Sequence, residues 1–279
     1  MLTILMALKR YHPLFLERAI ASVIAQDSPA WRLLVIVEQL DLLQFQELLS
    51  SALTDPRIEL VTHPGHGIAA PLNAGMRHAT TEFVGILHGD DLWSSDSVRV
   101  LLRNIAAQPG VDFFHSSRRF IDEDDRSLSG VYEAKARFSV EDFHWSSPVK
   151  HLLCWRREFA LAIGGIDESL PSVGPDDYDF PWVMMERGAT FRAVRECLYI
   201  YRDHRQSYRL TTHLPLTVHR DGIRRILEKH AVPPAIIEQR LAESERSYLQ
   251  QCLYESEADM QVKQASGHDP RTGWREPYR

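Results

Sequence analysis

The first half of the chain alternates short apolar runs with longer stretches in which apolar residues recur at helical spacing. The short runs predict strands at residues 2–8, 32–38, 58–62, 83–87 and 111–116. The intervening stretches predict helices at 14–26, 42–53, 68–79 and 96–106. In the first helix, Leu16, Ile20, Val23 and Ile24 fall on one face, which we expect to be buried. This alternation is typical of an α/β domain with a mostly parallel sheet flanked by helices.

The pattern becomes less regular from about residue 118 onward. Residues 122–125 form a predicted charged turn, and 143–145 a predicted aromatic loop. A cluster of acidic residues at 176–179 precedes a helical stretch that ends near residue 187. Residues 215–260 are predicted to be mostly helical, with a break at Pro233 and Pro234. The polar tail, 261–279, is predicted to be flexible.

Composition narrows the class of protein. The chain has 279 residues, of which 44% are hydrophobic, enough to bury a sizeable core. Its net charge of −6 argues against nucleic acid as a partner, because phosphate backbones require clustered Lys and Arg. The three cysteines are far apart, so we expect neither a disulfide framework nor a zinc site, and a cytoplasmic location. No apolar stretch approaches the ~20 residues of a membrane span, so any membrane role would be peripheral.

Two acidic clusters carry the candidate chemistry. Asp90 and Asp91 follow a predicted strand, and ligands of parallel sheets bind beyond the carboxyl ends of strands. Carboxylates there would hold Mg²⁺ or Mn²⁺ together with a diphosphate. Asp176 and Asp177 would supply a general base about ninety residues later. The alternative for each pair is structural, because aspartates also favour the amino ends of helices.

Four blocks of the sequence, in order, resemble family-two glycosyltransferases of the GT-A fold. They are TILMALKRYHPLFLERAIASVIAQD, GHGIAAPLNAGMRHATTEFVGILHGDDLW, REFALAIGGIDESLPSVGPDDYDF and LYIYRDHRQS. The resemblance extends from about residue 2 to residue 204. It implies a GT-A domain over residues 1–210, with a nucleotide-sugar-binding half at 1–115 and an acceptor half at 116–210. A helical C-terminal extension at 211–260 would follow.

The resemblance also assigns roles to individual residues. It implies that Asp177 is the catalytic base, with Asp176 as the acid before it. It implies that Asp90 and Asp91 bind the metal and the donor, and that His204 is a further metal ligand. The remaining donor-binding residues that it implies are Glu38, Asn73, Arg77, His88 and Arg202.

Two positions depart from the family's pattern. The metal motif is usually Asp-x-Asp, whereas this chain has His88-Gly89-Asp90, so imidazole stands in place of the first carboxylate. Imidazole is a competent metal ligand, but a histidine at a strand end can equally have no role. Glu38 stands where the family has an aspartate that accepts a hydrogen bond from uracil, so the donor's nucleobase stays open.

The resemblance implies an inverting transfer from a nucleotide diphosphate sugar, with a UDP-sugar as the first choice, to a saccharide or glycolipid acceptor. Cell-envelope polysaccharide, lipopolysaccharide or glycolipid synthesis at the inner face of the membrane would be the setting. Trp145, in the aromatic loop, is the best candidate for stacking on an acceptor sugar. Arg220, Arg224, Arg225 and Lys229 share a helical face that would contact a membrane, a second copy of the chain or solvent.

Two alternatives remain. One is a non-catalytic nucleotide-sugar-binding member of the same fold, suggested by the changes at His88 and Glu38. The other is a sugar nucleotidyltransferase, which is less favoured because no Gly-rich, basic loop follows the first predicted strand.

Overall fold

The computed structural model describes residues 1–9, 11–65, 67–170, 174–203 and 216–246. It divides into two compact units. The first comprises residues 1–168 and 175–205, and the second comprises 169–174 and 206–279. The predicted boundary at residue 210, the predicted flexible tail and His204 lie outside the described residues.

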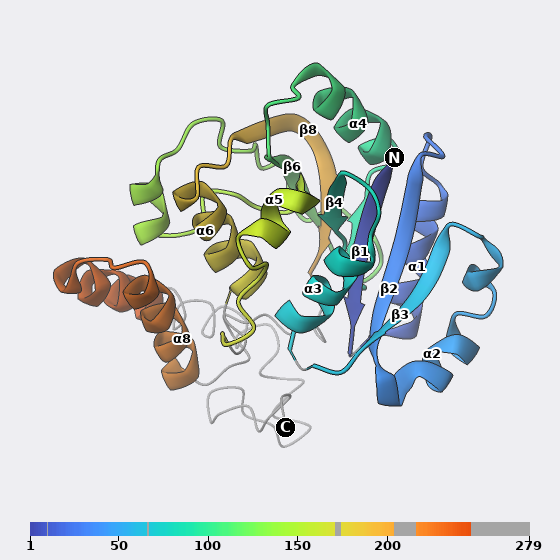
Figure 1. The fold of residues 1–279 in the computed structure, drawn as a ribbon, viewed down its shortest axis with the longest axis horizontal. Helices are drawn as coiled ribbons and strands as arrows, with labels where there is room; N and C mark the ends of the chain where they lie inside the picture. Colours follow the sequence, from blue (N-terminus) through green and yellow to red (C-terminus); the bar gives the residue numbers. More distant parts are fainter. Residues whose placement is uncertain (10, 66, 171–173, 204–215, 247–279) are drawn as a thin grey trace. The chain divides into compact units, whose positions relative to one another are not determined.

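An eight-stranded sheet forms the centre of the first unit (Figure 1). Its strands are β1 (Leu2–Leu8), β2 (Trp31–Glu38), β3 (Ile58–His63), β4 (Phe83–Ile86), β5 (Leu92–Trp93), β6 (Phe113–Ile121), β7 (Leu153–Arg156) and β8 (Phe191–Arg202). Their order across the sheet is β3-β2-β1-β4-β7-β6-β8-β5. Pairing is parallel from β3 to β4 and between β6 and β8, while β7 and β5 run in the opposite direction. The mixed, mostly parallel α/β sheet is therefore confirmed.

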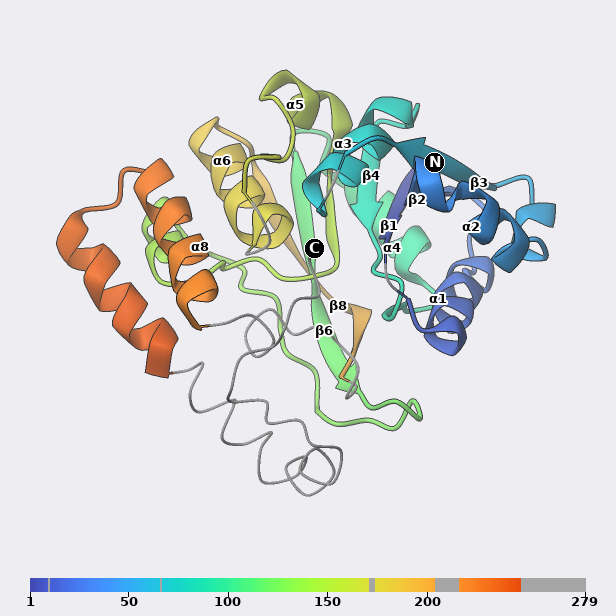
Figure 2. The same cartoon turned by 90° about the horizontal axis from the view of Figure 1, so that it is seen from below.

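Helices cover both faces of this sheet, as the two views in Figures 1 and 2 show. They are α1 (Pro13–Ile24), α2 (Leu42–Leu48), α3 (Ala69–His78), α4 (Ser97–Ala107), α5 (Arg157–Ala162) and α6 (Phe180–Glu186). α2 is shorter than the predicted helix 42–53, because the chain leaves it after Leu48 and makes a separate 3-10 turn at Ala52–Thr54.

Strand β1 shows how alternation divides the core in two. Ile4 and Met6 pack on one side with apolar residues of α1, α2 and α4, whereas Leu5 packs on the other side with residues of α3, α5 and α6. Successive strand residues point to opposite faces, so a strand buried on both faces is apolar throughout. In α1, Leu16, Ile20 and Val23 are buried as predicted, but the prediction for Ile24 was wrong, because that side chain at the last turn is 44% exposed.

The second unit contains α8 (Leu216–Lys229) and a further helix at 234–246, joined across Pro233. Arg220 pairs with Glu238 at 3.8 Å and with Glu245 at 3.3 Å, and Arg224 pairs with Glu238 at 2.9 Å. Acidic residues of the second helix therefore pair with two of the four basic residues that the sequence placed on one face, Arg220 and Arg224. Within the described residues, no helix combines the length and apolarity that crossing a lipid bilayer requires.

Candidate active site

Strand direction brings the candidate residues to one edge of the sheet. β4, β6 and β8 run the same way, so the residues after β4, after β6 and at the end of β8 meet there. β7 runs in the opposite direction between β4 and β6, so the residue pair before it, His151-Leu152, reaches the same edge. The predicted edge cluster at His88, Asp90 and Asp91 therefore has a histidine neighbour from another part of the sequence.

Asp91 joins the end of β4 to β8. Its side chain is only 2% exposed, and both carboxylate oxygens accept hydrogen bonds at 2.7 Å, one from the Tyr199 hydroxyl and one from the Arg202 backbone N–H. Burial, with a further contribution from the neighbouring Asp90, raises the pKa of Asp91 well above its ordinary value. Each oxygen of Asp91 thus accepts one hydrogen bond within the protein, and these two bonds join the end of β4 to β8.

Arg202 is also held inside the protein. Its fully buried guanidinium lies over the ring of Phe15 and donates at 2.9 Å from Nε to the Asp90 carbonyl. Nη1 donates to the Asp122 carbonyl at 2.9 Å and pairs with Asp125 at 2.5 Å. Arg202 therefore fixes the turn after β6 against the end of β4, while its buried Nη2 has no hydrogen-bond partner among the described residues.

The second acidic cluster lies on a single π-helical turn, Pro175–Asp179, that leads into α6. Such turns are rare and frequently mark functional sites. Asp176 is buried, and burial together with the neighbouring Asp177 raises the pKa of Asp176 to about 6. The Asp177 side chain is 38% exposed. The turn thus places one carboxylate inside the protein and the next one facing outward.

Two histidines connect the acidic clusters. Nε2 of His88 lies 4.0 Å from a carboxylate oxygen of Asp176, and Nε2 of His151 lies 3.9 Å from a carboxylate oxygen of Asp177. The two imidazole rings are 4.8 Å apart. Burial, followed by the nearby charge of His88, lowers the pKa of His151 well below its ordinary value, so this imidazole is neutral at pH 7. His88, two residues before Asp90, and Asp176 are therefore neighbours in the fold.

The same group of side chains fits a divalent cation. One ligand atom from each of His88, His151 and Asp176 lies within 4.8 Å of the other two. Imidazole nitrogen and carboxylate oxygen are both ligands of Mn²⁺ and Zn²⁺. Asp90, which the sequence assigned to the metal, is half-buried, and its charge acts on both Asp91 and Tyr199.

The predicted donor-binding residues on α3 lie in other settings. The buried Asn73 side chain donates at 2.8 Å to the Ile166 carbonyl and to Glu168, and accepts at 2.9 Å from the Ile166 N–H. It therefore holds the Gly-Gly loop that precedes the acidic turn. Arg77 is exposed in the last turn of α3, which leads to the start of β4, so the structure does not bring it to the carboxyl edge.

Glu38 and Trp145 are each held next to elements of the candidate site. Glu38 lies at the carboxyl end of β2, and Trp145 follows a 3-10 helix that is hydrogen-bonded to the acidic turn. Glu38 ends β2 and forms an ion pair with Lys9, which follows β1, so a salt bridge spans the carboxyl ends of two paired strands. Trp145 is 38% exposed and follows the 3-10 helix Val140–His144, where the Phe143 carbonyl accepts a 2.5 Å hydrogen bond from Tyr178. Tyr178 is the residue after Asp177, so this hydrogen bond links the segment that carries Trp145 to the acidic turn.

Three residues of this site were not predicted from the sequence: His151, Tyr199 and Arg118. Tyr199 donates to Asp91, and its ring lies 5.3 Å from that of His151. Arg118 on β6 is opposite Tyr199 in register. Its positive charge interacts with the negative charge of Asp177. The alternation of aromatic and aliphatic residues in 198–201 was a signal for Tyr199, whereas no local pattern distinguished His151.

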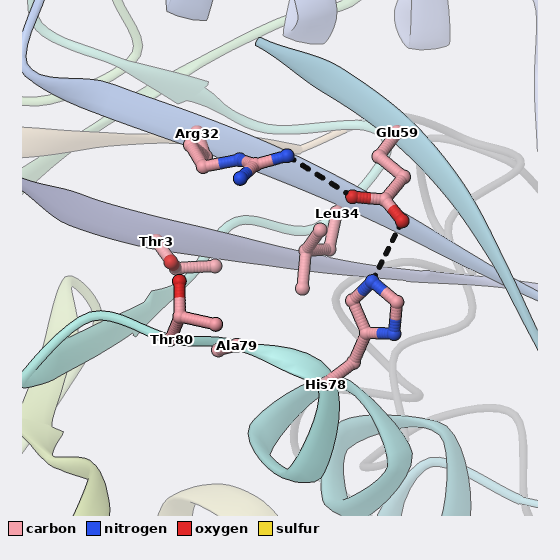
Figure 3. A pocket seen from close by; sticks show the side chains of 7 residues that line it. All are labelled: Thr3, Arg32, Leu34, Glu59, His78, Ala79 and Thr80. Carbon is pink, nitrogen blue, oxygen red and sulfur yellow. Dashed lines mark hydrogen bonds and ion pairs between the residues drawn. The ribbon is translucent and has the colours of Figure 1, made fainter.

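A separate surface hollow lies at the opposite edge of the sheet (Figure 3). It is lined by Thr3, Arg32, Leu34, Glu59, His78, Ala79 and Thr80. Glu59 accepts from Arg32 at 3.2 Å and lies 2.6 Å from His78, so the charged groups lining the hollow are paired with one another. The hollow is formed by the starts of β1, β2 and β3, and therefore does not belong to the carboxyl-edge group.

With this geometry established, comparisons identify the family. The profile of glycosyl transferase family 2 matches residues 3–161, which is more than half of the chain. The chain belongs to this family. None of the curated proteins compared with the chain matches it.

Solved structures similar to this family member share its fold. Residues 1–349 of TarS from S. aureus, in complex with UDP-GlcNAc, superpose with a TM-score of 0.62 at 15% identity, covering 87% of this chain and 71% of that one. A mannosyltransferase from Pyrobaculum calidifontis, PcManGT, in complex with GDP-Man and Mn²⁺, gives 0.59 at 17% identity, covering 95% and 79%. Against the longer TarS structure, with a TM-score of 0.57 at 15% identity, the match covers 87% of this chain but only 42% of TarS. At these identities the likeness confirms the GT-A fold.

Proposed function

We propose that this protein transfers a glycosyl group from a nucleotide diphosphate sugar to an acceptor hydroxyl, with inversion at the anomeric carbon. The observation that supports the proposal is that His88, next to the first acidic cluster, lies 4.0 Å from Asp176 of the second, while His151 lies 3.9 Å from Asp177. Membership of glycosyl transferase family 2 supports the reaction class.

The outward-facing Asp177 is suited to the role of general base. A carboxylate that removes a proton must be reachable by the acceptor, and Asp177 is exposed whereas Asp176 is buried. The acceptor oxygen would form a bond to the anomeric carbon while its proton passes to Asp177. The bond from that carbon to the diphosphate breaks at the same time, and its electron pair leaves with the nucleoside diphosphate.

The donor would occupy the other side of this group. Asp90 and His88 lie beyond β4, and Glu38 is the last residue of β2, so the carboxyl ends of the parallel strands would line the donor side. A divalent cation, when bound, supplies positive charge that stabilises the leaving diphosphate. TarS was solved with UDP-GlcNAc and PcManGT with GDP-Man and Mn²⁺, which supports a nucleotide-sugar donor and a divalent cation here. We keep a UDP-sugar as the first donor to test.

The second substrate, the acceptor, would bind next to Asp177. A saccharide or glycolipid would approach Asp177 from the side of the aromatic loop, where the half-exposed Trp145 offers a ring for stacking against a sugar. Synthesis of a cell-envelope polysaccharide on the cytoplasmic side of the membrane is the corresponding role, and a homodimer is the corresponding assembly.

The proposal predicts the behaviour of Asp177→Asn. Loss of a general base typically lowers turnover by about 100- to 10,000-fold. We expect Asp177→Asn to lower kcat for nucleoside diphosphate release within that range, while the Kd of the donor stays within about threefold. The measurement is release of UDP or GDP from a panel of nucleotide sugars with a saccharide acceptor and Mn²⁺. Asp124→Asn, in the exposed turn after β6, serves as the matched control and should keep full turnover.

Near-normal turnover by Asp177→Asn would remove Asp177 from the mechanism. Donor binding without release of nucleoside diphosphate by the wild-type protein would instead favour a non-catalytic nucleotide-sugar-binding protein. Formation of a nucleotide sugar from a nucleoside triphosphate and a sugar phosphate would favour a nucleotidyltransferase.

A further inference from the structure

We propose that His88, His151 and Asp176 form the cation site of this chain, and that the site selects a first-row transition-metal ion such as Mn²⁺, Co²⁺ or Zn²⁺ over Mg²⁺. This assignment differs from the pair Asp90 and Asp91 that the sequence suggested. Its geometry stands by itself, while its part in holding a donor diphosphate rests on the proposed function.

The distances suit a shared ion after small side-chain movements. His88 Nε2 and the Asp176 carboxylate oxygen are 4.0 Å apart, and the ligand atoms of all three residues lie within 4.8 Å of one another. Ligands at about 2.0–2.2 Å from a tetrahedral ion are about 3.4 Å apart. Drawing the three groups together by about an ångström therefore completes the site, and His88, whose side chain is 25% exposed, has room to turn.

Rigid elements hold the three ligands in place. His88 follows β4, and His151 precedes β7, which is paired with β4. Asp176 is fixed by the π-helical turn before α6. Sites built on such elements are positioned more precisely than sites on free loops.

The buried ring of His151 supplies an independent indication of a ligand. Its side chain is one-tenth exposed, and in the described part of the chain its Nδ1 has no hydrogen-bond partner, although buried polar atoms are nearly always paired. The other ring nitrogen, Nε2, is 3.9 Å from Asp177, which is too far for a hydrogen bond. The described protein atoms thus leave both ring nitrogens of this buried imidazole without a hydrogen bond, and a bound cation would satisfy one of them.

The donor set determines which ion is preferred. Mg²⁺ favours six oxygen ligands in an octahedron, several of them water. Two imidazole nitrogens with one carboxylate oxygen favour transition metals, whose affinity rises from Mn²⁺ through Co²⁺. By contrast, Asp91, the all-oxygen alternative, already has both oxygens hydrogen-bonded at 2.7 Å.

The test is a Co²⁺ titration of the full chain after chelator treatment, followed by visible absorption of the bound ion, with no sugar nucleotide present. We expect saturable Co²⁺ binding, displaced by Zn²⁺ and Mn²⁺ but not by a tenfold excess of Mg²⁺. His88→Gln, His151→Gln and Asp176→Asn should each raise the Kd for Co²⁺ by at least tenfold. His78→Gln, at the opposite edge of the sheet, is the matched control and should leave the Kd unchanged.

His88→Gln is the decisive variant, because its partly exposed side chain is the one whose replacement is least disruptive to folding, which circular dichroism checks. An unchanged Kd for Co²⁺ in folded His88→Gln and Asp176→Asn, or displacement by equimolar Mg²⁺, would overturn the assignment. A parallel titration with UDP and GDP separates the two proposals. Nucleoside diphosphate binding that keeps its cation dependence in His88→Gln contradicts this site only, whereas Co²⁺ binding without any nucleotide binding contradicts the proposed function only.

Discussion

Adjacent carboxylates in this protein have different surroundings, and this difference separates structural from chemical roles. Asp91 is buried and hydrogen-bonded to β8, whereas Asp90 is half-buried. Asp176 is buried, whereas Asp177 faces outward. The resemblance already named Asp177 rather than Asp176 as the base, but it did not separate Asp90 from Asp91, because that difference depends on partners such as Tyr199 that come from distant strands.

Buried histidine is the second feature at the residue scale. His115 on β6 is 1% exposed, and burial lowers its pKa to about 4 from an ordinary value of 6.5. The folded protein therefore holds this ring neutral down to about pH 4, while the unfolded chain takes up a proton near pH 6.5. Because the unfolded state binds more protons between these values, the free energy of unfolding falls as pH decreases through that window.

From this difference we predict a specific loss of acid stability. Between pH 7 and pH 4, His115 should lower the free energy of unfolding by about 3 kcal/mol. His115→Leu should lose correspondingly less over the same range, as measured by urea unfolding at a series of pH values. Equal slopes for wild type and His115→Leu would show that this ring does not titrate on unfolding.

At the scale of elements, apolar runs predicted β1 to β4 and the first part of β6, but not β5, β7 and β8. β1, β2 and β4 are buried, continuous runs of the kind that parallel sheets require, whereas the edge strand β3 is half-buried, and the predicted ends of all four agree with the structure within two residues. β7 has four residues and β5 has two, which is too short for a periodic signal. β8 was not predicted, because half-exposed residues and arginines interrupt its apolar positions.

The position of the acidic turn Pro175–Asp179 depends on the loop before it, which is in contact with α3. Asn73 on α3 holds the loop through Ile166 and Glu168. Gly165 has a φ of +77°, and a Cβ there would lie 2.5 Å from the Asn73 amide oxygen. Gly164 has a φ of +98°, but a Cβ there would meet nothing within 4 Å.

We therefore predict different costs for two neighbouring substitutions. Gly164→Ala should lower the free energy of unfolding by about 1–2 kcal/mol, because only the left-handed backbone conformation is strained. Gly165→Ala should cost about 1–3 kcal/mol more, because it also displaces the buried Asn73 side chain. Urea unfolding of both variants measures the difference. Equal losses would mean that Asn73 does not hold this loop as the structure indicates.

At the scale of the whole molecule, family resemblance predicted more than local patterns could. The order of four motifs indicated the GT-A fold, and both the fold and the family are confirmed. The sequence also predicted that two acidic clusters about ninety residues apart would converge. In the structure His88, two residues before Asp90, lies 4.0 Å from Asp176, and His151 lies 3.9 Å from Asp177. His151 itself was not predictable, because its position depends on the insertion of an antiparallel strand between β4 and β6.

Hydrogen exchange of the full chain with and without a bound nucleotide sugar tests the central claim most directly. The account predicts that UDP- or GDP-sugar with Mn²⁺ slows amide exchange in two separate peptides, one covering residues 86–92 and the other residues 174–180. Peptides covering 57–60 and 78–81, next to the hollow at the opposite edge, should be unchanged. Protection at that opposite edge, or in only one of the two acidic segments, would contradict a shared site at the carboxyl ends of the strands.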